Sequence, residues 1–162
     1  QIAKSQPVTL TDPDMTRFIM NLDQSVELVL KAASVAVGGE IFILKMPTVR
    51  IGDLASVMIE TLAPRYGLNP KKVPVKTIGV RNGEKFHEEL LTETESRSCL
   101  ETGEMFILLT PEIDARFAKD ERLKRGYGKF WKTKASSYSS DQAPVMTRAQ
   151  IRKSLTDDIL EA

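Results

Sequence analysis

Two arginines stand where a chain of alternating strands and helices would place a binding site for an anion. Arg17 directly follows a turn, in residues 14–18 (DMTRF), and lies at the edge of an expected strand. Arg81 stands where a later expected strand ends, in residues 80–85 (VRNGEK). Open α/β sheets bind ligands at strand ends, and a guanidinium offers forked donors that match phosphate oxygens.

The residues that follow Arg81 extend this expectation. Gly83 lets the chain turn sharply, and the amides of a following helix add positive potential. Glu84 stands three residues after the arginine, where its carboxylate can accept a hydrogen bond from a hydroxyl such as one on a ribose. The alternative is that both arginines form surface ion pairs or cap strand ends. Chemistry alone favours this alternative, because Arg-x-Gly-Glu is a common combination.

The neighbouring polar residues are better explained without a reactive site. His87 follows Phe86, which we expect to point inward, so a partly buried or surface histidine on a helix is favoured over a ligand. Glu84, Glu88 and Glu89 could form paired carboxylates for acid–base chemistry. An acidic helix face in water explains these three residues better.

A basic stretch, residues 119–134, carries seven Lys and Arg side chains with Tyr127, Phe130 and Trp131 among them. Such a mixture can bind single-stranded nucleic acid by charge and stacking. Asp120 and Glu121 interrupt the run, and the net charge of the whole chain is only +1. A surface loop or a subunit contact is therefore favoured, and we expect no nucleic acid partner.

The motifs of a self-contained enzyme are missing from this sequence. It has no G-x-G-x-x-G, no P-loop, no G-x-S-x-G elbow, and no Tyr followed by Lys four residues later. A single cysteine, Cys99, and a single histidine make no zinc site and no intramolecular disulfide. We expect no catalytic residue, no cofactor site and no metal site here, and a reducing cytoplasm is the simplest location.

The elements that must position these residues alternate between strand and helix patterns. Strands are expected at residues 8–11, 18–20, 41–44, 73–80 and 105–109, and the run at 41–44 is typical of a buried strand. Helices are expected from Leu22 to the stop at 38–39, over 51–62, briefly after Gly83, and from about Arg148. Thr147 and Gln150 have the spacing of a capping box for the last helix.

The alternation predicts an α/β fold, but one with few and short strands. A length of 162 residues suits one domain, with 41% hydrophobic and 28% charged residues typical of globular proteins. We expect a single substrate-binding domain over 1–162, divided into an α/β core at 1–117, a basic loop segment at 118–146 and a helix at 147–162. No apolar run is long enough to span a membrane.

Several stretches, in the same order along the chain, resemble one family. Residues 9–18 (TLTDPDMTRF), 38–47 (GGEIFILKMP), 51–55 (IGDLA) and 78–88 (IGVRNGEKFHE) are similar to segments of nucleotide-sugar 4,6-dehydratases of polysaccharide biosynthesis, which act on UDP-N-acetylglucosamine. Residues 136–141 resemble a late Tyr-Ser-Ser stretch of the inverting subgroup. These enzymes are extended short-chain dehydrogenase/reductases. The resemblance covers nearly the whole chain.

The resemblance implies the substrate-binding carboxy-terminal portion of such an enzyme, lacking most of the Rossmann sheet. In the parent enzyme, NADP or NAD and the catalytic Tyr and Lys belong to an amino-terminal Rossmann domain, so this chain alone would be inactive. The substrate-binding residues implied for the UDP-sugar are Arg17, Arg81, Glu84, Met15, Thr16, Ser139, Ser140 and Asp141. Arg17 and Arg81 would bind the diphosphate, and Glu84 the ribose. The missing Rossmann domain and further copies of the chain are the expected partners. The alternative is a non-catalytic binding or assembly module derived from this fold.

Overall fold

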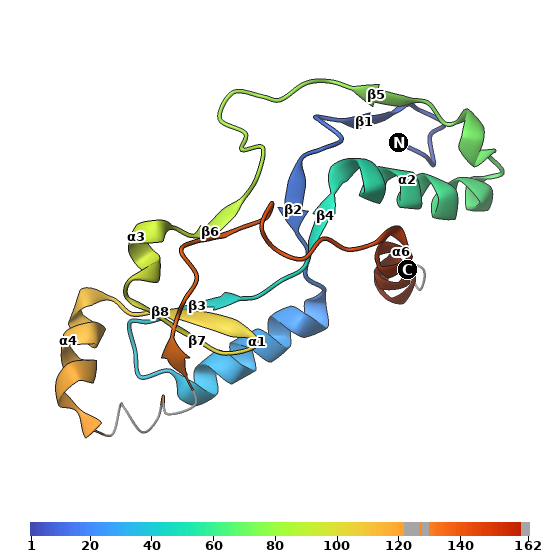
Figure 1. Cartoon of the computed structure of the whole chain (residues 1–162). Helices are drawn as coiled ribbons and strands as arrows, with labels where there is room; N and C mark the ends of the chain where they lie inside the picture. The colour runs from blue at the N-terminus through green and yellow to red at the C-terminus, as the bar shows by residue number, and fades with distance from the viewer. Residues whose placement is uncertain (122–126, 128–129, 160–162) are drawn as a thin grey trace. The chain divides into compact units, whose positions relative to one another are not determined.

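A computed structural model of the chain describes residues 1–121, 127 and 130–159, without the side chains of residues 118 and 156–159. Two compact units can be separated (Figure 1). Unit 1 comprises Gln1–Ile19, Pro47–Glu88 and Ser140–Ala162, and unit 2 comprises Met20–Met46 and Glu89–Ser139. The mixed α/β character expected from the sequence is confirmed, whereas a single substrate-binding domain over the whole chain stays a prediction.

Unit 1 is built from short strands and two longer helices. Its elements in chain order are β1 (Val8–Leu10), β2 (Thr16–Phe18), β4 (Thr48–Arg50), α2 (Ile51–Leu62), η1 (Ala63–Tyr66), η2 (Pro70–Lys72), β5 (Val75–Thr77) and α6 (Arg148–Ile159). β1 pairs in parallel with β5, and β2 pairs antiparallel with β4. The second pairing places Arg17 opposite Val49, which brings residue 17 next to the strand that leads into α2.

One of the two buried clusters of unit 1 forms where α6 packs against α2. Val49, Val57 and Ile151 are buried together there, with exposed fractions of 2% or less. α6 begins as expected, because the Gln150 N–H donates to Thr147 Oγ1 and the Thr147 N–H donates to Gln150 Oε1. This capping box fixes the start of the helix that covers one side of α2.

Unit 2 contains a four-stranded antiparallel sheet in the order β3-β8-β7-β9. The elements are α1 (Leu22–Val35), β3 (Ile41–Leu44), β6 (Glu89–Leu91), α3 (Glu93–Ser96), β7 (Cys99–Glu101), β8 (Met105–Leu108), α4 (Pro111–Lys119), β9 (Trp131–Lys132) and β10 (Tyr138–Ser139). Phe106 and Ile107 are neighbours on β8, yet they belong to two separate buried clusters, because successive side chains of a strand point to opposite faces.

The expectation of a buried strand at residues 41–44 is only partly right. β3 has the expected bounds, but it lies at the edge of the sheet and pairs only with β8. Ile43 is buried, whereas Ile41 is 53% exposed. An apolar run alone does not distinguish a central strand from an edge strand.

Helix α1 begins at Leu22 as expected and ends at Val35, before the expected stop at 38–39, and its apolar side chains are not covered. No residue of this helix is buried. The residues of the expected apolar face, Leu22, Val26, Val29 and Leu30, have exposed fractions between 50% and 76%. The Asn21 side chain caps the start of the helix and forms a capping box with Gln24. Local capping therefore sets the helix, and its apolar outer face lacks a partner among the described residues.

The expected short helix after Gly83 and the expected loop from residue 118 are both wrong. The residues after Gly83 form turns and bends that lead into β6, not a short helix, and Phe86 is 39% exposed. The segment expected to be a loop from residue 118 contains β9 and β10, each of which pairs with a strand from elsewhere in unit 2. No helix formed by the described residues is both long enough and apolar enough to cross a membrane.

Candidate functional site

A pocket in unit 1 is the candidate site. Its volume is about 640 Å³, within the range of known small-molecule sites. The wall that α2 contributes is apolar and consists of Ile51, Leu54, Ala55, Met58 and Leu62. Residues 1–3 and 8–11, together with Tyr66 and Ile78, complete the apolar and hydroxyl-bearing lining. Arg17, Arg81 and Glu84 supply the charged part. The pocket therefore combines an apolar surface with two guanidinium groups.

The segment that carries Arg81 and Glu84 is a tight turn. The Glu84 N–H donates to the Arg81 carbonyl at 3.0 Å, and the Arg81 N–H donates to Glu84 Oε2 at 3.2 Å. Gly83 has a φ of +82°, a conformation that side chains other than hydrogen rarely adopt. The turn presents residues 81 and 84 on the same part of the loop, as the sequence spacing suggested.

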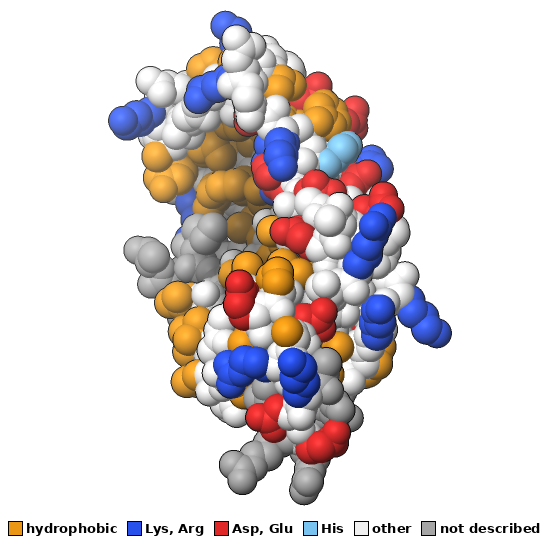
Figure 2. Space-filling model, turned by 90° about the vertical axis from the view of Figure 1, so that its left-hand side faces the viewer, with side chains coloured by type: hydrophobic (Ala, Val, Ile, Leu, Met, Phe, Trp, Pro, Cys, Tyr) orange, Lys and Arg blue, Asp and Glu red, His pale blue; other side chains and the backbone are white. Residues whose placement is uncertain are grey.

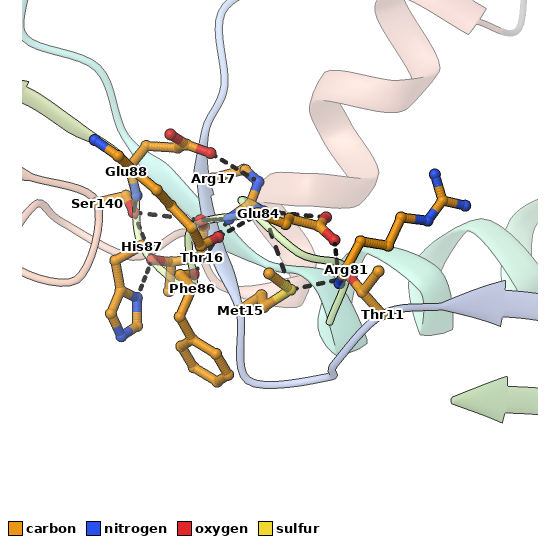
Figure 3. A network of polar contacts seen from close by, with 11 residues as sticks. Thr11, Met15, Thr16, Arg17, Arg81, Glu84, Phe86, His87, Glu88 and Ser140 are labelled. Atoms are coloured by element: carbon orange, nitrogen blue, oxygen red, sulfur yellow. Dashed lines mark hydrogen bonds and ion pairs between the residues drawn. The ribbon is translucent and has the colours of Figure 1, made fainter. Parts of the chain in front are cut away.

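The two arginine side chains differ in the contacts that they make within the protein. Figure 3 shows the Arg81 side chain extending away from the polar network around Arg17. Arg81 is exposed, and none of the described residues forms a hydrogen bond or ion pair with its guanidinium. A guanidinium in this state can accept an anionic ligand without breaking a contact within the protein.

Arg17, in contrast, is surrounded by acceptors. Its Nη1 donates to the carbonyls of Thr16 at 2.7 Å and Phe86 at 3.2 Å, and its Nη2 donates to the carbonyl of Lys85 at 3.0 Å. Two carboxylates balance its charge: Glu88 Oε1 lies 3.3 Å from Nε, and Glu84 Oε1 lies 3.6 Å from Nη2. An anion at Arg17 would have to compete with these carboxylates.

The carboxylates near the site therefore act as partners of an arginine. Glu84 and Glu88 both pair with Arg17, which replaces the expectation of an acidic helix face in water. Glu84 also accepts from the Arg81 N–H, so one carboxylate bridges the two arginine positions. Two carboxylates held by one guanidinium are not arranged as an acid–base pair.

His87 and two hydroxyls form a buried polar cluster beside Arg17 (Figure 3). Thr16 Oγ1 lies 2.8 Å from His87 Nδ1 and 2.6 Å from Ser140 Oγ. Thr16 and Ser140 are 5% and 0% exposed. His87 is half-buried on a turn, not on a helix as the sequence suggested. Its role in this network was not apparent from the sequence, because its partner Thr16 lies 71 residues away.

The remaining residues implied by the family resemblance occupy varied positions. Met15 is fully buried, and its Sδ accepts a hydrogen bond from the Thr11 hydroxyl at 3.0 Å. Asp141 is exposed in unit 1, whereas Ser139 is half-buried on β10 of unit 2. Met15, Thr16 and Ser140 are not among the described residues that line the pocket. The ligand-binding roles of all eight residues stay predictions.

The apolar wall is the part of the site that sequence reasoning did not identify. The i, i+3, i+4 spacing at residues 51–62 indicated a helix face, and such a face is usually core. In the structure the buried residues of α2 are Val57 and Ile59, which belong to two separate clusters, and the predicted face lines the pocket. The spacing correctly predicted the helix, but it could not show that the face borders a cavity.

The residues that the structure describes show neither a metal site nor a nucleic-acid surface. Among the described residues, no group of three or more His, Cys, Asp and Glu side chains could hold a metal ion. On the face shown in Figure 2, the described basic and acidic side chains are interspersed without an extended patch of one charge. Much of the basic stretch considered above, residues 122–126 and 128–129, lies outside the described residues.

Comparison with known proteins places the chain among polysaccharide biosynthesis proteins. A family model with the description "Polysaccharide biosynthesis protein" matches residues 1–110. A protein of Methanocaldococcus jannaschii, named "Uncharacterized membrane protein MJ1061", is 45% identical over 97% of this chain and 43% of its own length.

Two further proteins match over most of this chain. The inverting UDP-N-acetylglucosamine 4,6-dehydratase of Campylobacter jejuni is 32% identical over 88% of this chain and 39% of its own length. The X-ray structure of Pen from Bacillus thuringiensis has a TM-score of 0.79 and 36% identity, covering 97% of this chain and 42% of the Pen chain. The chain thus spans less than half of the length of each of these relatives.

Proposed function

Because the chain belongs to the family of polysaccharide biosynthesis proteins, we propose that it is the nucleotide-sugar-binding portion of a larger enzyme of this family. The observation that carries the proposal is the convergence of Arg17, Arg81 and Glu84 on one apolar pocket of unit 1. Among substrates of polysaccharide biosynthesis, a nucleoside diphosphate sugar combines the required features. It has a charged diphosphate, ribose hydroxyls and a flat base.

Each part of such a ligand has a chemical counterpart in the pocket. The Arg81 guanidinium, which lacks a partner among the described residues, would bind the diphosphate through charge-assisted hydrogen bonds. Arg17 would join it by exchanging one of its carboxylate partners for a phosphate oxygen. Glu84, released from Arg17 in this exchange, would accept from a ribose hydroxyl. The apolar wall of α2 would contact the base.

In its specific form, the proposal is the carboxy-terminal portion of a UDP-N-acetylglucosamine 4,6-dehydratase of the 5-inverting kind. It is supported by the collinear motifs described above and by the similarity to the Campylobacter jejuni dehydratase. Anchoring the UDP group here would hold the sugar in place while another part of the enzyme acts on it. The role of these residues is binding and orientation.

NADP or NAD would belong to the remaining part of the parent enzyme. This sequence contains neither G-x-G-x-x-G nor the Tyr and Lys expected of the catalytic domain. The cofactor would take a hydride from the sugar and later return it there, and no described residue of this chain is assigned a step in that transfer. We therefore expect the chain alone to be inactive. A cytoplasmic location is proposed because the lone thiol, Cys99, is free and buried.

The outer face of α1 supports the idea that a further protein part packs on unit 2. A helix with apolar residues on both sides is usually covered on both. Leu22, Val29 and Leu30 are each more than 60% exposed, and over half of each relative's length has no counterpart here. We propose that the remaining part of the parent enzyme, a Rossmann domain, covers this face. The isolated chain should self-associate through the same face.

Calorimetric titration with uridine, UDP and UDP-N-acetylglucosamine tests the proposed function. We expect UDP to bind at least about tenfold more tightly than uridine, because hydrogen bonds to charged groups contribute about 1.5–3 kcal/mol each. UDP-N-acetylglucosamine should bind at least as well as UDP. Equal affinities for UDP and uridine would contradict the proposal.

Absence of binding by a folded sample would also contradict the proposal that this portion carries the site. Adding the remaining part of a relative would then distinguish a site that needs both parts from a binding or assembly module that has lost its ligand. Recovery of UDP binding in the mixture would indicate the former, and continued absence would indicate the latter.

A further inference from the structure

Three segments of unit 1 that are far apart in the sequence meet at one hydrogen-bond cluster. The cluster consists of Thr16 on β2, His87 and Glu88 at the end of the loop 78–88, and Ser140. None of the four is among the described residues that line the pocket. Any influence of this cluster on a ligand must therefore act through other residues.

The loop 78–88 depends on such contacts because it forms no helix or strand. Its beginning is attached to the end of β1, since the Ile78 N–H donates to the Leu10 carbonyl at 2.8 Å. Its other end is attached to Ser140 twice. The Glu88 N–H donates to Ser140 Oγ at 2.8 Å, and the Ser140 N–H donates to the Glu88 carbonyl at 2.7 Å. The intervening turn carries Arg81 and Glu84.

The two hydroxyls of the cluster join this loop end to β2. Ser140 Oγ lies 2.6 Å from Thr16 Oγ1 and 3.3 Å from the Thr16 carbonyl. Thr16 Oγ1 in turn lies 2.8 Å from His87 Nδ1. With Nδ1 unprotonated, Ser140 donates to Thr16 and Thr16 donates to His87. With Nδ1 protonated, His87 donates to Thr16, Thr16 donates to Ser140, and the Ser140 hydroxyl donates to the Thr16 carbonyl. The buried hydroxyls are satisfied in both arrangements.

The same main-chain groups also hold Arg17. The Thr16 carbonyl accepts a hydrogen bond from Arg17 Nη1, and it also lies within hydrogen-bond distance of Ser140 Oγ. The Thr16 N–H donates to the Phe86 carbonyl, which is a second acceptor for Arg17. A shift of the loop end relative to β2 would therefore move the acceptors of Arg17 and the turn that presents Arg81.

We propose that Thr16, His87 and Ser140 are positioning residues, which hold Arg17, Arg81 and Glu84 in the geometry that binds a nucleoside diphosphate. This inference rests on the proposed function. Because buried polar groups form a connected network, removing one hydroxyl leaves its partners unsatisfied and loosens the attachment of the loop. The loss should appear as weaker diphosphate binding in a chain that is still folded.

Matched variants of Thr16 and Ser140 test the proposal, with UDP as the probe and the whole 162-residue chain as the protein. Thr16→Val removes the hydroxyl and keeps the shape, whereas Thr16→Ser keeps the hydroxyl. Ser140→Ala removes the second hydroxyl. Ser96→Ala is the control, because Ser96 is a buried serine of unit 2 whose hydroxyl donates to the Glu93 carbonyl of its own helix. Circular dichroism establishes that each variant is folded before titration.

Thr16→Val and Ser140→Ala should raise the Kd for UDP about tenfold, while Thr16→Ser and Ser96→Ala should change it less than about twofold. The chain has one histidine, so the NMR signal of the His87 ring is unambiguous. This signal should shift when UDP binds to the wild-type chain, although His87 does not line the pocket. In Thr16→Val the shift should disappear.

The failure of the positioning role can be told apart from failure of the proposed function. If the wild-type chain binds UDP and both hydroxyl-free variants bind it equally well, the positioning role is wrong and the function stands. Weakening by Thr16→Ser as large as that by Thr16→Val would show that the hydroxyl does not sustain UDP binding, and it would also overturn the positioning role. A wild-type chain that does not bind UDP refutes the function and the positioning role together.

Discussion

Replacing Gly52 by alanine should destabilise unit 1, although glycine in a helix normally costs stability. Gly52 lies in the first turn of α2, and its N–H donates to the Pro13 carbonyl at 2.9 Å. A Cβ at this position would lie 2.9 Å from Pro13 Cβ and 3.0 Å from Pro13 O. Two of the three nearest atoms are backbone atoms of the turn before β2, so the contact cannot be relieved by rotating a side chain.

Two opposing terms decide the magnitude. Alanine is better than glycine in a helix by about 1 kcal/mol. Overpacking of this kind typically costs about 1–3 kcal/mol, and separating α2 from the turn would also weaken the hydrogen bond to Pro13 by about 1 kcal/mol. The net expectation is a loss of roughly 1–3 kcal/mol. The turn precedes Arg17 directly, so the same shift should weaken UDP binding.

Urea unfolding followed by circular dichroism measures the first effect. With a urea m-value of about 2 kcal/mol/M, the midpoint for Gly52→Ala should fall by roughly 0.5–1.5 M. Gly103→Ala is the matched control, because a Cβ there meets no atom within 4 Å and the backbone needs no positive φ. An unfolding midpoint of Gly52→Ala equal to or above that of the wild-type chain would refute the close contact between α2 and the turn.

Three further outcomes follow from the packing and ionisation of the two units. Burial raises the pKa of the Cys99 thiol to about 11. The contribution of this protonated thiol to the unfolding free energy is therefore fully present below the ordinary thiol pKa of about 8.5 and is lost as pH rises through about 11. The unfolding free energy should therefore fall over this interval, and less so in Cys99→Ala. Burial raises the pKa of the Glu101 carboxyl, but hydrogen bonds from Lys45 and Thr133 outweigh it and leave the pKa below its usual value. The contribution of the ionised Glu101 carboxylate to the unfolding free energy is present above the ordinary Glu pKa of about 4.3 and is lost as pH falls. Lys45→Met should lower the unfolding free energy at neutral pH by roughly 2 kcal/mol and reduce the loss on acidification. Ile151→Ala should cost about 2–5 kcal/mol in urea unfolding, because it opens a cavity between α6 and α2; a cost below 1 kcal/mol would contradict that packing.

Elements whose signals are local could be predicted from the sequence. The start of α1 and the bounds of α2 follow from apolar spacing, and the start of α6 follows from the capping pair Thr147 and Gln150. The Arg-x-Gly-Glu turn at residues 81–84 follows from the conformational freedom of Gly83. In these places the sequence neighbours themselves supply the hydrogen bonds, so no distant residue is needed.

Elements whose partners are distant could not be predicted. Cys99–Glu101 forms β7 only because β8 and β9 pair with it, and its sequence has no alternation of its own. His87 and Ser140 meet at Thr16 across separations of 71 and 124 residues. The state of Arg17 is likewise set by carbonyls of residues 85 and 86, which a motif cannot show.

The most direct test of the proposed UDP-binding site compares Arg81→Ala with Lys85→Ala in titrations with UDP. Lys85 is an exposed residue of the same loop, and it is not among the described residues that line the pocket. Both variants remove one positive charge from the loop, and Lys85→Ala keeps the carbonyl that holds Arg17. If Arg81 binds the diphosphate, Arg81→Ala should raise the Kd for UDP by at least about tenfold and Lys85→Ala by about twofold or less. Equal effects of the two variants, or none, would contradict a diphosphate site at Arg81.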